Sequence, residues 1–133
     1  MDSIRAVAAV AAGGAVGALG RFAISEAGAG LGVAAPWATL VVNVAGCFLM
    51  GLLVAAILAD PARHPIWRPL LGVGALGGFT TFSAFAGDAV LLADEGAWLA
   101  AAGYVVFSLL GGLLALRAGV ATGERRRALR GES

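Results

Sequence analysis

Charged residues are scarce in this sequence of 133 residues: they make up 13% of it, whereas an ordinary soluble domain carries about 25%. A soluble domain of this length buries only about 70% of its chain surface, and so few charges would not keep the remainder dispersed in water. The hydrophobic fraction is high, at 60%, and the mean hydropathy is +0.92. These figures exclude soluble globular, disordered and nucleic-acid-binding proteins, and they predict an integral membrane protein.

Residues that form disulfides and metal sites are also rare. The single cysteine, Cys47, excludes an intrachain disulfide, and the single histidine, His64, leaves no cluster of metal ligands to assemble. The net charge of +1 offers no electric field to an acidic partner. No Asp, Glu, Lys or His falls at the centre of a predicted span, and the sequence shows no nucleophile–base pair. We therefore expect neither an enzyme nor a proton-driven transporter.

Four uncharged runs divide the chain, at residues 6–20, 27–59, 69–87 and 96–116. A helix that crosses about 30 Å of hydrocarbon needs about 20 mostly apolar residues and satisfies its own backbone. The second run is too long for one span, and its early glycines and Pro36 predict a loop followed by a helix. The sequence thus predicts one all-α membrane domain with four transmembrane helices, at about 4–26, 36–59, 66–93 and 96–117, and a polar Arg-rich tail at 118–133.

The arginines lie almost entirely on one side of this predicted topology. Four spans place the N-terminus, the middle loop and the tail on the same side, which holds Arg5, Arg63, Arg68, Arg117, Arg125, Arg126, Arg127 and Arg130. The other side holds Arg21, together with Glu26, Asp94 and Glu95. Because Arg-rich loops stay in the cytoplasm, we expect both termini there.

The most informative segment is GGFTTFSAF, at residues 77–85 of the third span. Its two glycines and two β-branched threonines fall near the middle of the span, where they weaken a helix. An interruption at this point would free carbonyl groups that coordinate a cation. A glycine pair packed against a neighbouring helix is the alternative, and composition does not decide between the two.

Small residues recur at helical spacing in two spans, with Gly13 and Gly17 in the first and Gly74 and Gly78 in the third. Such pairs let helix backbones approach closely in lipid. Packing within one chain is the plainer explanation. Four helices do not by themselves enclose a pore, however, and this favours assembly with another chain.

Polar and aromatic side chains in the second and third spans suit an anion. Asn43, one turn after Thr39, either forms a hydrogen bond between helices or offers its amide N–H groups to an anion. Phe82 and Phe85 are three residues apart and share a helix face. They either pack in the interior or hold a small anion by their electropositive ring edges.

Two further features extend this inventory. Tyr104 and Ser108 place two hydroxyls on one face of the fourth span, unless the serine bonds its own backbone. Arg21, near the predicted end of the first span, either snorkels to the interface or lines an electropositive vestibule. Uncharged donors, ring edges and an interrupted helix together favour a passive pathway for an anion.

Three motifs follow one another along the chain: GGxxGAxxR at 13–21, TLxxNxxG at 39–46 and GxxTTFSxF at 77–85, with Tyr104 and Ser108 after them. With these motifs the sequence resembles the Fluc (CrcB) family of small bacterial fluoride channels over nearly its whole length. The resemblance implies a channel in the bacterial plasma membrane. It also implies that the channel exports cytoplasmic fluoride and thereby reduces its toxicity.

The resemblance also implies an antiparallel dimer in which the third helix is broken at mid-membrane. A structural sodium ion would lie at the dimer centre, held by the backbone carbonyls of Gly77 and Thr80. The residues implied to contact fluoride are Asn43, Phe82 and Phe85. The residues implied to line the route are Thr39, Ser83, Tyr104 and Ser108, with Arg21 facing the vestibule.

Several residues depart from the family pattern, namely Ala38, Ala84, Asp88 and Gly112. The one-sided arginines favour a single membrane orientation, so an oppositely oriented homologue is the hypothesised partner in place of a second copy. A small dual-topology multidrug transporter and a non-conducting assembly subunit are the alternative functions. The transporter would need a membrane-embedded carboxylate, and Glu26 lies too near a predicted helix end to serve.

Overall fold

The computed structural model describes residues 3–58 and 65–129, and within these ranges every regular element is a helix. Their order is α1 (Ser3–Gly30), α2 (Ala35–Leu53), η1 (Val54–Leu58), η2 (Arg68–Leu76), α3 (Gly77–Phe79), α4 (Phe82–Asp94) and α5 (Trp98–Leu129). η1 continues α2 and η2 leads into α3, both with π-helical winding. The predicted loop around Arg63 and His64 and the end of the tail with Arg130 lie outside the described residues.

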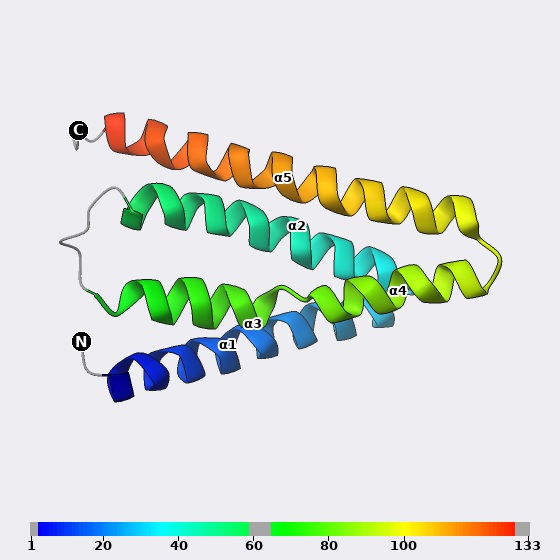
Figure 1. The fold of residues 1–133 in the computed structure, drawn as a ribbon, viewed down its shortest axis with the longest axis horizontal. Coiled ribbons are helices and arrows are strands. Elements are labelled where there is room, and N and C mark those ends of the chain that lie inside the picture. The colour runs from blue at the N-terminus through cyan, green and yellow to red at the C-terminus, as the bar shows by residue number, and fades with distance from the viewer. Residues whose placement is uncertain (1–2, 59–64, 130–133) are drawn as a thin grey trace.

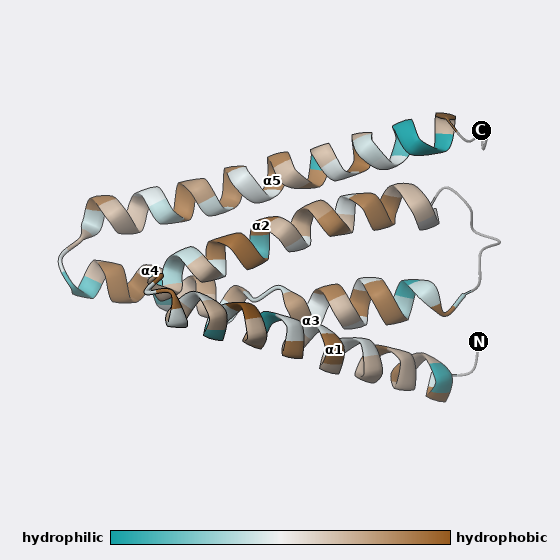
Figure 2. Ribbon diagram, turned by 180° about the vertical axis from the view of Figure 1, so that it is seen from behind, coloured by the Kyte–Doolittle hydropathy of each residue, from teal (hydrophilic) through white to brown (hydrophobic). Residues whose placement is uncertain are grey.

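The chain is an all-helical, multi-pass membrane protein. Four stretches are long and apolar enough to cross a membrane: Ser3–Gly30, Ala35–Ala56, Arg68–Asp94 and Trp98–Leu129. Figure 2 shows hydrophobic residues along all four of them. Large apolar side chains such as Val16, Phe22 and Leu114 are exposed on the surface of the bundle, as expected for helices surrounded by lipid.

α1 continues past the predicted end at residue 26 to Gly30, which reduces the predicted glycine loop to a short turn. Gly28 lies inside the helix and beside α2: an added Cβ would lie 3.6 Å from the Cβ of Ala38, an ordinary contact distance. Gly32 forms the turn with a φ of +74°, a conformation that favours glycine. Pro36 lies in the first turn of α2, as predicted.

α5 likewise continues beyond its predicted end, so the predicted polar tail is helical through Leu129. Two glycines hold this extension against α2 and η1. A side chain at Gly119 would overlap the Phe48 carbonyl, and a Cβ at Gly123 would lie 2.5 Å from that of Ala55. The glycines of the tail therefore serve close packing and do not end the helix.

The helices form two parallel pairs, which the third span connects (Figure 1). α1 packs mainly against η2 and α3, and α2 packs mainly against α5. α4 lies instead against α5 and α2. The third span thus belongs to one pair before its interruption and to the other pair after it.

Glycines form the seam between α1 and the first half of the third span: Gly13, Gly14, Gly17, Gly74 and Gly78. A side chain at Gly17 would overlap the carbonyl of Ala75, and one at Gly78 would overlap the carbonyl of Gly14. Only glycine allows two helix backbones to approach this closely. The glycine pairs pack within the chain, which confirms the plainer explanation of their spacing.

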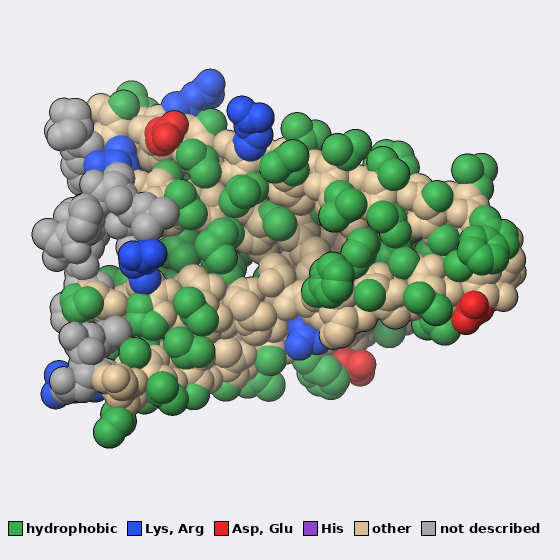
Figure 3. Space-filling model, in the orientation of Figure 1, with side chains coloured by type: hydrophobic (Ala, Val, Ile, Leu, Met, Phe, Trp, Pro, Cys, Tyr) green, Lys and Arg blue, Asp and Glu red, His purple; other side chains and the backbone are tan. Residues whose placement is uncertain are grey.

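The two ends of the bundle differ in charge (Figure 3). The end that holds both termini carries Arg5, Arg68, Arg125, Arg126 and Arg127 together with Glu124, and Arg117 lies nearer the middle of α5. The opposite end carries the acidic turn of Asp94 and Glu95, which Gly96 closes with a φ of +78°. The arginine asymmetry in the sequence is therefore an asymmetry between the two ends of the folded chain.

Candidate functional site

The third span is interrupted at Thr80 and Thr81. Their backbones are extended, with φ and ψ of −78° and 155° for Thr80 and of −144° and 122° for Thr81. Gly78, just before them, packs on α1. Glycine packing and a helix interruption, the two readings of this segment, therefore occur together. The position of the interruption at mid-membrane stays a prediction.

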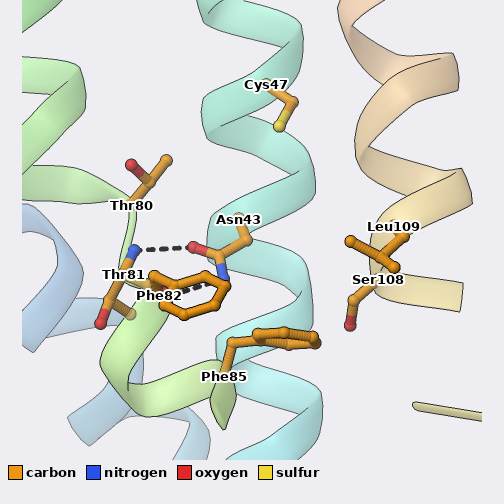
Figure 4. A pocket seen from close by; sticks show the side chains of 8 residues that line it. All are labelled: Asn43, Cys47, Thr80, Thr81, Phe82, Phe85, Ser108 and Leu109. Atoms are coloured by element: carbon orange, nitrogen blue, oxygen red, sulfur yellow. Dashed lines mark hydrogen bonds between the residues drawn. The ribbon is translucent and has the colours of Figure 1, made fainter. Parts of the chain in front are cut away.

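The amide of Asn43 holds the extended residues from α2 (Figure 4). Its Nδ2 donates to the Thr81 carbonyl at 2.9 Å, and its Oδ1 accepts from the Thr81 N–H at 2.8 Å. One side chain thus provides both partners that the backbone of Thr81 would find in a helix. The predicted hydrogen bond between helices is confirmed, and Nδ2 carries a second hydrogen beyond the one given to Thr81.

Three further contacts fix the two sides of the interruption. The Thr80 hydroxyl donates to the Leu76 carbonyl at 2.9 Å, which completes the end of the first helical half. The Thr81 Oγ1 accepts from the Ala84 N–H at 3.2 Å and caps the start of α4. Gly46 lets the segment approach α2, because a side chain there would overlap the Thr80 methyl group. The two threonines therefore end one helix and begin the next.

An open pocket of about 260 Å³ lies beside the interruption, between α2, α4 and α5 (Figure 4). It brings together several predicted site residues: Asn43, Thr80, Phe82, Phe85 and Ser108. Its lining is completed by Cys47, Thr81 and Leu109, which are not among the predicted site residues. The Ser108 hydroxyl is buried and has no hydrogen-bond partner within the described ranges, so it is not bonded to its own backbone. The pocket therefore offers amide and hydroxyl donors beside two aromatic rings.

Aromatic rings continue from this pocket along α4 and α5. The ring centroids of Phe82 and Phe85 are 5.7 Å apart, and those of Phe85 and Tyr104 are 5.5 Å apart, with the rings tilted by 48° and 35°. Phe82 is 79% exposed, so packing in the interior of this chain does not explain it. Phe85 connects the pocket to Tyr104.

Asp88 joins this region, although it is not among the predicted site residues. It is 8% exposed and accepts a 3.3 Å hydrogen bond from the Tyr104 hydroxyl. The hydroxyls of Thr39 and Ser108 lie beside that of Tyr104. Asp88 follows Phe85 by three residues, and this spacing was the available signal because it places both on one face of α4. A carboxylate is therefore buried within the third span, although none lies at its centre.

Five predicted site residues do not line this pocket: Arg21, Thr39, Gly77, Ser83 and Tyr104. Ser83 is exposed, and its hydroxyl shares a 3.2 Å hydrogen bond with that of Thr81. Arg21 is half-buried, and its Nε donates to the Gly78 carbonyl at 3.2 Å. Because α1 continues to Gly30, Arg21 lies well inside the helix.

A second cavity, of about 470 Å³, adjoins the pocket at Cys47 and Thr80. Gly77 and Thr80, the residues predicted to hold sodium, both line it. Further lining residues are apolar, among them Met50, Val73 and Leu116. Within the described ranges, no group of three or more His, Cys, Asp or Glu side chains lies close enough together to hold a metal ion. A cation in this cavity would therefore depend on backbone oxygens.

The hydrogen bonds at the interruption identify the carbonyls that are already engaged. Those of Leu76, Gly78 and Thr81 accept hydrogen bonds within the chain. The other carbonyls at this point belong to Gly77, Phe79 and Thr80. Oxygens at the C-terminal end of an interrupted helix carry partial negative charge and suit a sodium ion. The residues present therefore fit the predicted sodium site.

Comparison with known proteins gives one consistent family. The profile of the family described as CrcB-like protein, Camphor Resistance (CrcB), matches residues 8–120. The fluoride-specific ion channel FluC of Chelativorans sp. (strain BNC1) is 49% identical over 112 residues, which cover 84% of this chain and 90% of the relative. The FluC protein of Rhodospirillum centenum (strain ATCC 51521 / SW) is 50% identical over 119 residues, covering 84% and 92%. That of Stutzerimonas stutzeri (strain A1501) is 45% identical over 124 residues, covering 89% and 96%.

Proposed function

This chain belongs to the CrcB-like family, and we propose that it is a subunit of a fluoride-selective channel that exports cytoplasmic fluoride from bacteria and so reduces its toxicity. The names of the relatives support fluoride as the ion and favour neither a multidrug transporter nor an assembly subunit. The observation that carries the proposal is the pocket beside the interrupted helix, where uncharged donors and aromatic rings meet. The proposed location is the bacterial plasma membrane.

The chemistry of the pocket suits fluoride. This ion is small and strongly hydrated, so a channel must replace its water with several close donors. The second amide hydrogen of Asn43 and the hydroxyl of Ser108 are such donors. The ring edges of Phe82 and Phe85 add positive electrostatic potential. None of these groups carries a charge, so the ion is not bound too tightly to leave.

We infer that the route continues from the pocket towards Tyr104 and Thr39. The rings of Phe85 and Tyr104, which are in contact at a tilt of 35°, connect the two regions. Asp88 already accepts the hydroxyl hydrogen of Tyr104. An ion that reaches Tyr104 therefore competes with this carboxylate for the same hydrogen or passes along the Thr39 hydroxyl. Ser83 lies outside this route in the single chain.

A second subunit in the antiparallel orientation completes the channel in our proposal. Phe82 is largely exposed, and a Cβ at Gly77 would meet only open space, so both residues are available to another chain. Antiparallel pairing brings the basic end of one chain beside the acidic end of the other, whereas parallel pairing brings like charges together. A two-fold axis in the membrane plane would meet both third spans at their interruptions.

A structural sodium ion, which is not transported, would lie on this axis. The carbonyls of Gly77 and Thr80 from each chain would hold it. When bound, sodium supplies a positive charge that stabilises the C-terminal ends of the interrupted helices. The N–H groups four residues after Gly77 and Thr80, which a continuous helix would direct to these oxygens, bond elsewhere: that of Thr81 to Asn43, and that of Ala84 to the Thr81 hydroxyl.

The partner is hypothesised to be an oppositely oriented homologue. The basic end of this chain favours the cytoplasm, so both termini are proposed to lie there. An antiparallel homodimer would need half of the copies to insert with that end outside. Purified chain that forms an active dimer on its own in liposomes would disprove this hypothesis without affecting the proposed ion.

Efflux from liposomes tests the proposed function. The chain is reconstituted alone and together with an oppositely oriented homologue, and the active preparation is used for all variants. Fluoride-selective and chloride-selective electrodes record release from liposomes loaded with both anions. We expect rapid fluoride release while chloride stays inside. Equal release of the two anions would refute a fluoride-selective channel, and empty liposomes are the control.

A further inference from the structure

Arg21 lies where it acts on the interruption of the third span. Arg21 lies well inside α1, and its Nε donates to the Gly78 carbonyl at 3.2 Å. Gly17 and Gly14 make this contact possible, because the seam that they form brings the backbones of α1 and α3 together. The guanidinium therefore meets the last turn of the first helical half.

That last turn needs an external partner. The helical stretch ends at Phe79: the Thr80 N–H still donates to the Leu76 carbonyl at 2.9 Å, whereas the Thr81 N–H bonds the Asn43 side chain in place of a helical carbonyl. The last carbonyls of a helix lack intrahelical partners and carry partial negative charge. A permanently charged N–H donor at Gly78 satisfies one of them and stabilises this helix end.

Asn43 acts on the interruption from the opposite side. Its amide bonds both backbone groups of Thr81 from α2, while Arg21 bonds Gly78 from α1. Two neighbouring helices thus hold the segment on either side of Thr80. We propose that Arg21 is a positioning residue that fixes the end of the first helical half, and with it the carbonyls and side chains at the break. This role rests on the proposed function only because the break borders the fluoride pocket.

Two roles for Arg21 can be distinguished by substitution: positioning the helix end through its Nε, and attracting fluoride through its positive charge. In arginine the bonded Nε follows three methylene carbons, and glutamine places its amide nitrogen at the same distance along the chain. Lysine keeps the charge but has a methylene group at that point. Positioning by Nε therefore predicts better function for Arg21→Gln than for Arg21→Lys. Attraction of fluoride by charge alone predicts the reverse order.

Hydrogen exchange of the full-length protein tests the proposal directly. We expect Arg21→Met to speed exchange of amides in residues 79–85 about tenfold, the scale of one lost charged hydrogen bond. Amides in the α2–α5 pair should not change, and Arg21→Gln should restore most of the protection. Arg117→Met, which removes an exposed arginine from α5, is the matched control and should leave residues 79–85 unchanged. Unchanged exchange in Arg21→Met would overturn the proposal.

Fluoride efflux at low and high salt provides the second readout. We expect the slower efflux of Arg21→Met to persist at high ionic strength, because a displaced helix end is not repaired by screening. Efflux that becomes equal to that of the wild type at high salt, or that is normal in Arg21→Lys but not in Arg21→Gln, would overturn the proposal. Should the wild type show no preference for fluoride, the proposed function fails, while hydrogen exchange still decides the role of Arg21.

Discussion

The two halves of the third span differ in how they pack and in what they present. η2 and α3 lie against α1 through glycines, with backbone close to backbone at Gly17 and Gly78. α4 begins with Phe82, which is 79% exposed, and borders an open pocket. The first half is held by close backbone packing on α1, and the second presents side chains to the pocket. Extended residues between them let one span combine an anchor with a binding surface.

The largest expected difference between the two halves is in stability, and a matched pair of glycine substitutions measures it. Gly78→Ala places a methyl group on the Gly14 carbonyl, and we expect it to destabilise the protein by about 3 kcal/mol. Gly87→Ala, in the other half, meets open space and should be neutral or stabilise the helix by up to about 1 kcal/mol. Thermal unfolding in detergent, followed by gel filtration, measures both. Equal stability of the two variants would show that the halves pack alike.

Removal of the Asn43 amide should affect both halves through the segment between them. Asn43→Ala leaves the N–H and C=O of Thr81 without their partner, and we expect a loss of about 2 kcal/mol in stability. Fluoride efflux should fall about a hundredfold, because a donor is lost and the start of α4 shifts. Val41, an exposed residue of the same helix, provides the control substitution Val41→Ala. Wild-type efflux from Asn43→Ala would contradict the proposal that the Asn43 side chain holds Thr81 in place for transport.

Sodium removal should act on the first half of the span. Exchange of sodium for a large organic cation during purification should weaken the dimer by about tenfold in dissociation constant, because the Gly77 and Thr80 carbonyls would lose their counter-charge. Gel filtration over a range of protein concentrations measures the dissociation. Phe82→Ile, in the second half, should keep the same sodium dependence. A dimer that is equally stable in both media would count against the cation site.

Phe82→Ile should act on transport and leave assembly intact. The substitution keeps apolar volume and removes the ring edge, so we expect fluoride efflux to slow about tenfold. The matched control is Phe107→Ile on α5, which removes a ring that is 67% exposed and should leave efflux unchanged. Efflux measurements on dimeric fractions of each variant make the comparison. An unaffected Phe82→Ile channel would remove the ring-edge argument.

The smallest effects concern two serines. Ser108→Ala removes a buried hydroxyl that has no partner within the described ranges, and we expect efflux to slow about fivefold. Ser83→Ala removes a hydroxyl that bonds only weakly to Thr81 at the surface, and its effect should stay below about twofold. The reverse order would place the route on the other face of α4.

Local chemistry explains which features the sequence predicted. Long apolar runs located the helices, and adjacent glycines and β-branched threonines marked a segment for which an interruption and a packed glycine pair both stayed open. The helix ends were less predictable, because Gly28 and Gly119 look like helix breakers until the neighbouring helix that they contact is known. The same holds for the tail, whose polar composition does not show that α5 continues along α2 and η1.

Side-chain partners depend on tertiary contacts and were correspondingly harder to predict. The amide of Asn43 was expected to bond another helix, but only the fold brings Thr81 to it. Arg21 was expected at a vestibule, and the fold places its Nε on Gly78. Asp88 was noted only as a departure from the family pattern, and the fold shows that α5 covers it with Tyr104.

Labelling of Cys47 tests most directly whether fluoride crosses at the pocket beside the interruption. Cys47 is the only cysteine, and it lines both the pocket and the adjoining cavity. A small methanethiosulfonate reagent is applied to reconstituted protein, complete labelling is verified by mass spectrometry, and Cys47→Ser is the control. We expect fluoride efflux to stop in the labelled wild type and to continue in Cys47→Ser. Undiminished efflux from fully labelled protein would contradict a route through this pocket.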